Sequence, residues 1–152
     1  MFRLTIESVT RAKYGHQKLL ADTDRATQEA LEFAGRFAKD HVNKNPQFTP
    51  RTGALQAATK TRVIRTASGK LLRISNAKKY ASAIDGGAKR HWIGPRNKSA
   101  LRFRVGGRFV FSKGHWHPGN RPYKFLYRAT DAASRALERN LKQRLSAIAS
   151  RF

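Results

Sequence analysis

Positive charge is concentrated in the last two thirds of this chain, and that distribution excludes an ordinary neutral enzyme surface. Residues 51–152 hold 24 Lys and Arg against 3 Asp and Glu, whereas residues 1–50 hold 8 against 6. Between Asp40 and Asp131 the only acid is Asp85. Such a surface attracts polyanions by neutralising phosphates and releasing counterions. The sequence therefore favours proximity to nucleic acid, and the alternative is that the positive charge faces acidic patches on partner subunits.

Length and composition indicate one folded domain over residues 1–152. A chain of this length buries about 70% of the surface that it would expose when unfolded, which is enough for a single core. Hydrophobic residues make up 39% of the chain and 15 residues are aromatic, too many for a disordered basic tail. Cysteine is absent, so disulfides, thiolate zinc sites and cysteine nucleophiles are excluded.

A membrane-spanning or secretory segment is not expected. The longest stretch without a charged residue runs from Thr52 to Thr59, whereas a spanning helix needs about 20 apolar residues. The first ten residues alternate between apolar and polar types, so they do not look like a signal peptide. We expect a protein that stays inside the cell that makes it.

The first third of the chain predicts a strand, a long helix and a loop. Residues 2–6 alternate as in a strand with one buried face. From residue 14 to residue 42, apolar side chains recur at helical spacing. This stripe consists of Ala26, Ala30, Phe33, Phe37 and Val42. Residues 43–53 contain two prolines and Gly53, which end the helix and form an ordered or mobile loop of a length that often carries function.

The middle of the chain predicts a hairpin followed by a short helix. Residues 59–65 and 70–75 form the two strands, because Gly69 between them can adopt the positive φ of a tight turn. Residues 77–84 form the helix, and the pair Gly86-Gly87 follows it where a left-handed cap is wanted.

A second hairpin has the clearest pattern in the sequence. Apolar and basic residues alternate around the turn Gly106-Gly107. The apolar residues are Leu101, Phe103, Val105, Phe109 and Phe111, and the basic ones are Arg102, Arg104 and Arg108. We predict one aromatic and aliphatic face that packs as part of the core, and one face that is almost entirely basic.

The chain is predicted to end in a second long helix. Its apolar stripe consists of Leu126, Ala129, Ala133, Leu137, Leu141, Leu145, Ile148 and Phe152. Four cations form one row away from that stripe: Arg128, Arg135, Arg139 and Lys142. Such a row suits a phosphate backbone or the lining of a channel, while the plainer interpretation is a solvated helix face.

Candidate catalytic residues are few. Asp85 has no neighbouring acid with which to form a carboxylate pair, so we expect it to partner an arginine instead of acting as a general base. His115 and His117 have a spacing that points two rings to one side of a strand, but a third metal ligand is missing nearby. A metal-dependent nuclease that uses them is the enzymatic alternative. We favour a binding or assembly protein that is not an enzyme and has no cofactor or metal.

Several landmarks occur in an order that resembles a known family. They are Arg51-Thr52-Gly53-Ala54-Leu55, Tyr80-Ala81, Ile84-Asp85-Gly86, His91, Ile93, Pro95, Ala100-Leu101-Arg102-Phe103, Gly107, His117-Pro118-Gly119, Arg121-Pro122, Phe125-Leu126 and Ala129. Together they resemble the tail-completion, or head-to-tail joining, family of tailed bacteriophages, small neck proteins that attach the tail tube to the filled capsid. Where that family typically has glutamate, glycine and threonine, this chain has Asp85, Gly86 and Gly87.

The resemblance implies an α+β domain in which a small antiparallel sheet packs with a long N-terminal helix and a long C-terminal helix. Several copies would form a ring coaxial with the DNA channel in the neck of the virion, after synthesis in the host cytoplasm. Their partners would be head-completion or connector proteins on one side and tail tube or tail terminator proteins on the other, with no membrane involved.

Two sets of candidate site residues follow. Those that would face the genome DNA, where phosphate attraction needs no sequence readout, are Arg102, Arg104, Arg108, Arg128, Arg135, Arg139 and Lys142. Candidate docking loops at 43–53 and 86–100, with Phe48 and Trp92 as apolar anchors, contribute Phe48, Arg51, Thr52, Gly53, Asp85, Gly86, Gly87 and Trp92. The alternative function is a free-standing basic nucleic-acid-binding protein. A protein that binds single-stranded nucleic acid needs exposed aromatic side chains among its cations, whereas Phe103, Phe109 and Phe111 are predicted to be core residues.

Overall fold

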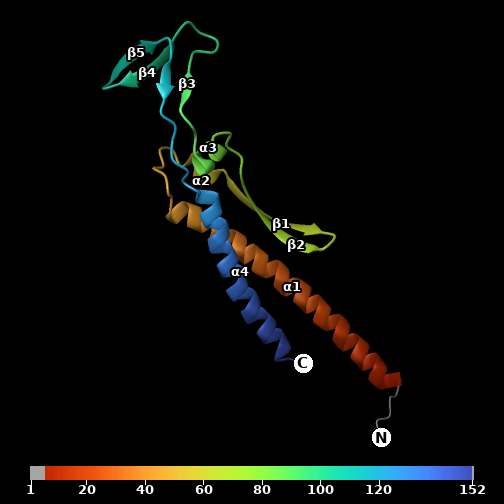
Figure 1. Cartoon of the computed structure of the whole chain (residues 1–152). Coiled ribbons are helices and arrows are strands. Elements are labelled where there is room, and N and C mark those ends of the chain that lie inside the picture. Colours follow the sequence, from red (N-terminus) through yellow and green to blue (C-terminus); the bar gives the residue numbers. More distant parts are fainter. Residues whose placement is uncertain (1–5, 152) are drawn as a thin grey trace.

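Two long antiparallel helices form the body of the molecule. The computed structural model describes the backbone of residues 6–151 and the side chains from Lys13 onward. Helix α1 (Ile6–Lys44) and helix α4 (Phe125–Ala149) lie side by side, and α1 begins at the end of the molecule where α4 ends (Figure 1). Both long helices are confirmed, and α1 begins earlier than predicted. The strand expected at residues 2–6 lies outside the described residues, except for Ile6, which begins α1.

Alanines line the contact between the two helices. On α1 they recur every fourth residue, and on α4 they occupy the facing positions. The buried alanines are Ala26, Ala30, Ala34, Ala38, Ala129, Ala132, Ala133 and Ala136. Small side chains let the two backbones approach closely, so the larger Phe33 and Phe37 are pushed to the edge of the contact. Their rings stack on each other at 6.5 Å and remain partly exposed, so placing them in the buried stripe was wrong.

A hairpin covers the middle of α1. Strand β1 (Thr59–Thr66) pairs antiparallel with β2 (Gly69–Asn76), which confirms the first predicted hairpin. Gly35 permits the close approach, because a Cβ there would lie 3.1 Å from Leu72 Cδ1. Next to the turn, Lys70 Nζ lies 2.7 Å from Asp24 Oδ1. The hydrogen bond from Lys70 holds the pKa of the Asp24 carboxyl below its usual value and ties the hairpin to α1.

Two short helices connect this hairpin to the rest of the fold. Helix α2 (Ala54–Ala57) precedes β1, and helix α3 (Ala81–Gly86) follows β2. The start predicted for α3, at residue 77, was too early. The Asn76 side chain accepts a hydrogen bond from Lys78 N–H at 3.0 Å and holds the chain in a turn there. The helix ends at the predicted glycine pair, with Gly86 as its last residue, but the expected left-handed cap was wrong: Gly87 has φ 80° and ψ 165°, an extended conformation outside the left-handed helical region.

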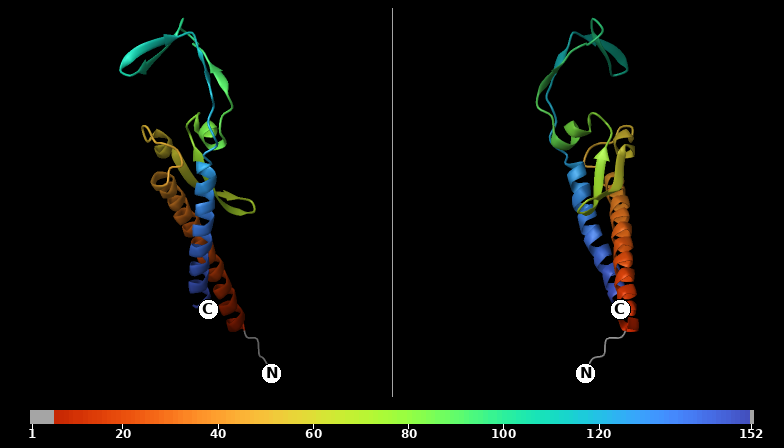
Figure 2. Two further views of the ribbon diagram at one scale, coloured as in Figure 1. Left: turned by 60° about the vertical axis from the view of Figure 1, so that its left-hand side comes forward. Right: turned by 90° about the vertical axis from the view of Figure 1, so that its right-hand side faces the viewer.

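Residues 88–120, here called the arm, project from one end of the helix pair (Figures 1 and 2). At the base, Ala88 and Asn120 exchange backbone hydrogen bonds of 3.0 and 2.9 Å. Further out, β3 (His91–Ile93) pairs with β6 (His115–His117), and β4 (Leu101–Val105) pairs with β5 (Arg108–Ser112). The second predicted hairpin is thus confirmed, but it lies far from the helix pair instead of on the core.

The register of β4 and β5 corrects the predicted faces of this hairpin. The two-residue turn pairs Phe103 with Val110 and Arg104 with Phe109. Directly paired residues share a face, so odd-numbered residues of β4 lie beside even-numbered residues of β5. Phe109 and Phe111 therefore lie on the arginine face, and Phe103 lies on the opposite one. The expected separation into an apolar face and a basic face was wrong.

The hydrophobic core lies where the helices, the first hairpin and α3 meet. It consists of Ala34, Ala38, Val42, Leu55, Ala81, Phe125, Ala129 and Ala133. The fold is α+β, as predicted, and the described residues form three separate two-stranded antiparallel sheets. The whole chain exposes 12318 Å² to solvent, whereas a compact monomer of its mass would expose about 7,800 Å². The difference reflects an open molecule with a thin core.

Candidate docking cavity and basic arm

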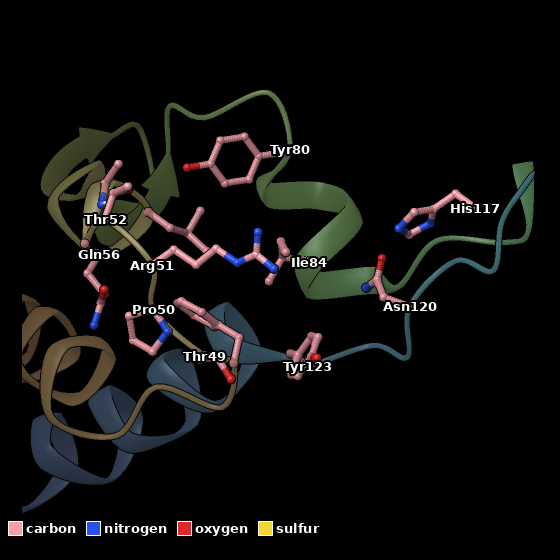
Figure 3. A pocket seen from close by; sticks show the side chains of 14 residues that line it. Thr49, Pro50, Arg51, Thr52, Gln56, Tyr80, Ile84, His117, Asn120 and Tyr123 are labelled. Carbon is pink, nitrogen blue, oxygen red and sulfur yellow. Dashed lines mark hydrogen bonds between the residues drawn. The ribbon is translucent and has the colours of Figure 1, made fainter. Parts of the chain in front are cut away.

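A cavity of about 600 Å³ lies between the loop that follows α1, helix α3 and the base of the arm (Figure 3). Its lining consists of Phe48, Thr49, Pro50, Arg51, Thr52, Gly53, Ala54, Leu55, Gln56, Tyr80, Ile84, His117, Asn120 and Tyr123. These residues come from segments that are far apart in the sequence. Arg51, Thr52, Gly53, Tyr80 and His117 were singled out from the sequence, and the fold brings them to one place.

The predicted loop at 43–53 begins only after Lys44, the last residue of α1, and it forms one wall of this cavity. Gly53 adopts φ 68°, a left-handed conformation that favours glycine, and α2 begins at the next residue. Phe48 packs edge-on against Phe125, with ring centroids 5.4 Å apart, and against Tyr123 at 6.4 Å. Phe48 is therefore held against the core and is half-buried, and its remaining surface lines the cavity, so its role as an apolar anchor stays a prediction.

Asp85 caps helix α4, and among the side chains that the structure describes it pairs with no arginine. Its Oδ1 accepts a hydrogen bond from Leu126 N–H at 2.8 Å, and its backbone carbonyl accepts one from Lys124 N–H at 3.0 Å. Lys124 holds the N-cap position with positive φ, and its own side chain makes no capping bond. Asp85 supplies from α3 the acceptor that an N-cap side chain normally provides. The expectation of an arginine partner was wrong because this free helix end lies closer.

The glycines of the candidate docking set serve the base of the arm. At Gly87 a Cβ would lie 3.0 Å from the carbonyl oxygen of Asn120 and 3.0 Å from Pro122 N. Gly119 has φ 88°, and a Cβ there would overlap the carbonyl of Ala88. These two glycines let the two sides of the arm meet closely. Gly86 ends α3 and has open space around its Cα.

Ala81, His117-Pro118-Gly119, Arg121-Pro122, Phe125-Leu126 and Ala129 fall on the same junction between arm and helix pair, whereas the landmarks from His91 to Gly107 lie further out on the arm. Ala81 and Phe125 are buried in the core. His117 Nδ1 accepts a hydrogen bond from Gly119 N–H at 3.0 Å, across the exposed Pro118. The landmarks near the base of the arm therefore build the junction or line the cavity beside it.

The end of the arm combines cations with exposed aromatic rings. Arg102 and Arg104 place their guanidinium carbons 4.6 and 5.4 Å from the ring centroid of Phe109. Phe109 is 56% exposed and Phe111 is 68% exposed. The prediction that these rings belong to the core was wrong, since the arm extends away from the helix pair and both rings are exposed. A cationic and aromatic surface of this kind can contact phosphates and stack on bases.

Nearer its base, the arm carries paired aromatic residues from its two strands. Trp92 lies opposite Trp116 with ring centroids 5.7 Å apart, and both side chains are more than half exposed. Arg90 lies 4.9 Å from the Trp116 ring. Trp92 is thus an exposed aromatic, in agreement with its selection as a candidate anchor. His91 faces His117 at 5.1 Å, across the same pair of strands.

The row of cations on α4 is separate from the arm. Arg128, Arg135, Arg139 and Lys142 are all exposed. Arg135 pairs with Asp131 at 2.5 Å. The row begins one helical turn from the junction and runs along α4 away from it. Because α4 and the arm extend in opposite directions from the junction (Figure 2), the candidate DNA-facing residues lie on two separate parts of the molecule.

The described residues contain no cluster of three or more His, Cys, Asp or Glu side chains suited to a metal ion. Within residues 6–151, every helix is too short or too polar to cross a membrane. Comparison with protein-family models, curated proteins and solved structures finds no match to this chain.

Sequence reasoning missed some members of the cavity and the exposure of the arm. Gln56, Asn120 and Tyr123 carried no recognisable pattern, because the cavity forms only when three distant segments meet. The exposure of Phe109 and Phe111 could have been found from the turn, since a two-residue turn fixes the register and hence the faces.

Proposed function

We propose that this chain is a ring-forming structural subunit at the neck of a tailed bacteriophage, where it joins the DNA-filled head to the tail by docking. The observation that carries the proposal is that most of the family landmarks meet at the base of the arm, while His91, Ile93, Pro95, Ala100-Leu101-Arg102-Phe103 and Gly107 lie further out on the arm. Arg51, Tyr80 and His117 line the cavity at its base, while Asp85 and Gly119 hold the arm and α4 in place. Residues that build a single junction are expected to recur in order among chains that share it.

The open shape supports a role in assembly. The accessible surface exceeds that of a compact monomer by about 4,500 Å². A stable interface of standard size buries about 800 Å² on each partner, so the open shape leaves enough surface for more than one neighbour. Trp92, Trp116 and the arm arginines are the residue types that dominate interface energies.

Two basic surfaces are available for the genome. The arm holds eight Lys and Arg residues and no Asp or Glu, and α4 adds its row of four cations. In a ring around a channel, either surface would attract the DNA backbone through phosphate contacts without reading its sequence. No catalytic step belongs to this proposal.

Immunogold electron microscopy of purified particles tests the proposal. Gold at the junction of head and tail is the expected result. Label absent from disrupted particles, with the protein found on free nucleic acid, would contradict it. The substitution Trp92→Ala should leave the folding of the monomer intact and block joining, because it removes an exposed anchor. Tyr127→Ala is the matched control, since Tyr127 is an exposed aromatic on α4, away from the arm.

The channel role has its own test. The double substitution Arg135→Glu and Arg139→Glu reverses charge in the middle of the α4 row. Assembly of infectious particles should fail together with duplex binding. Loss of duplex binding while infectious particles still assemble would show that the row does not line the channel.

A free-standing nucleic-acid-binding protein is the second candidate function. It is favoured by one observation, the exposure of Phe109 and Phe111 on the same face as Arg102 and Arg104. Both tryptophans of the chain, Trp92 and Trp116, lie in the arm, so their emission reports on this part of the molecule alone. This function predicts a change of emission on adding single-stranded oligonucleotide and no label on phage particles.

A further inference from the structure

The cavity beside the arm is poor in charge, although the chain as a whole is strongly basic. Of the 32 Lys and Arg residues in the sequence, only Arg51 belongs to its lining. The lining contains no Asp or Glu. Nucleic acid binding needs several cations along a groove, so this cavity is the wrong place for a polyphosphate. Its single cation is suited to one carboxylate.

The walls of the cavity offer both apolar surface and hydrogen-bond donors. Phe48, Pro50, Leu55, Ile84 and Tyr123 provide the apolar part. In Figure 3 the Arg51 side chain extends into the space between Pro50, Tyr80 and Ile84, and the Tyr80 hydroxyl points toward Thr52. The described residues provide no ion-pair partner for Arg51. A cavity of about 600 Å³ lies within the range in which proteins bind small ligands or short segments.

We propose that this cavity binds a short, extended, acidic segment of a partner protein. Arg51 pairs with one carboxylate of the segment, and an adjacent apolar side chain lies against Phe48, Ile84 and Tyr80. The inference deepens the proposed docking function of the loop at 43–53 and rests on it. The partner is identified by its chemistry, an acidic residue next to an aromatic or aliphatic one.

A second copy of this chain fits the cavity poorly. Its described acids lie mostly on α1 and α4, and a helix with side chains is about 10–12 Å across, so a cavity of this size admits little more than one turn. Several of these acids are also engaged within the copy: Asp24 pairs with Lys70, Glu29 with Arg144, and Asp131 with Arg135. A different protein with an acidic extended segment is the better match.

Fluorescence anisotropy with labelled peptides tests this inference on the full chain. The probe is fluorescein-Gly-Ser-Phe-Glu-Leu-Gly amide, and its matched control has Gln in place of Glu. A third peptide, Gly-Glu-Gly-Glu-Gly amide, measures attraction to the net charge alone. Titrations at 0.15 M and 0.5 M salt separate such long-range attraction from a local pair. A single-stranded oligonucleotide serves as competitor.

The expected result is a preference of about fivefold for the Glu probe over the Gln probe, the size of a partly exposed ion pair. Arg51→Gln should abolish the preference, whereas Arg96→Gln, which removes the same charge from an exposed loop of the arm, should keep it. Tyr80→Ala should weaken the binding of both probes by the same factor. The inference would be overturned if the two probes bound equally, or if the preference for the Glu probe survived in Arg51→Gln. It would also be overturned if the oligonucleotide, added at the same total negative charge as the probe, displaced the Glu probe.

This outcome is distinguishable from failure of the proposed function. If the protein labels the neck in immunogold images but shows no preference between the two probes, the acidic-segment inference fails and the neck proposal stands. If the preference is present and the protein is absent from particles, the cavity binds acidic segments in a protein of another function.

Discussion

Removal of the Asp85 carboxylate should destabilise the chain by about 1–2 kcal/mol. The Oδ1 of Asp85 accepts a half-buried hydrogen bond from Leu126 N–H at 2.8 Å. Loss of an N-cap acceptor costs about 0.5–2 kcal/mol, and a carboxylate at the positive end of a helix adds about 0.3–1 kcal/mol. For a chain of this size, the sum corresponds to a decrease in Tm of about 3–8 °C.

Urea denaturation followed by far-ultraviolet circular dichroism measures the effect. Asp85→Asn keeps an acceptor oxygen and loses the charge, so it should cost less than Asp85→Ala. Glu138→Gln removes the same charge from an exposed position on α4 and should change the free energy of unfolding by less than about 0.5 kcal/mol. If Asp85→Ala unfolds at the same urea concentration as Glu138→Gln, the capping role assigned to Asp85 is wrong.

Three further predictions concern the arm and the first hairpin. Replacing Arg102 and Arg104, which share one face of the β4–β5 hairpin, by Gln should reduce the steepness with which log K for duplex DNA falls with log salt by about 1.8, because each lost phosphate contact contributes about 0.9; an unchanged slope would remove the hairpin from the DNA-binding surface. Lys70 lowers the pKa of the Asp24 carboxyl, so the stability that this carboxylate contributes is present above its unfolded pKa and is lost as pH falls through its folded pKa. The difference in urea midpoint between wild type and Asp24→Asn should therefore shrink on acidification below about pH 4. A difference that stays constant would contradict the pairing. Gly119→Ala should separate the two sides of the arm at its base. The arm should then be cleaved rapidly by protease while the helices resist cleavage, and tryptophan emission should change. Equal proteolysis of wild type and variant would show that the close approach at Gly119 is dispensable.

Local patterns predicted the elements that depend on neighbours in sequence. Helical periodicity gave α1 and α4, and the glycine turns gave both hairpins. Fold class followed from these elements and from the family resemblance, and the structure confirms it as α+β. Each of these predictions rests on spacing within one segment, where the backbone geometry of helices and turns is repetitive.

The predictions that failed depended on which element lies against which. Phe33 and Phe37 matched the helical period as well as the alanines did, but only the alanines allow α4 to approach closely. Phe109 and Phe111 alternated like core residues, yet the fold carries their hairpin away from the helix pair. Asp85 was assigned an arginine because arginines are numerous, whereas the structure offers it the free N-terminus of α4. Long-range partners of this kind leave no periodic trace in the sequence.

The charge of the chain constrains any assembly that it forms. Each copy carries a formal net charge of +23, so identical copies repel one another. Asp24, Glu29 and Asp131 are already paired within the copy, and few carboxylates remain to bridge neighbours. Apolar contacts of the arm would therefore have to combine with counter-charge from outside the chain, either genome phosphates or acidic partner segments. Sedimentation of the isolated protein should accordingly show larger species on adding a short duplex, or on screening the charge with about 0.5 M salt. A ring that is stable at low salt without any polyanion would show that contacts between copies overcome this repulsion on their own.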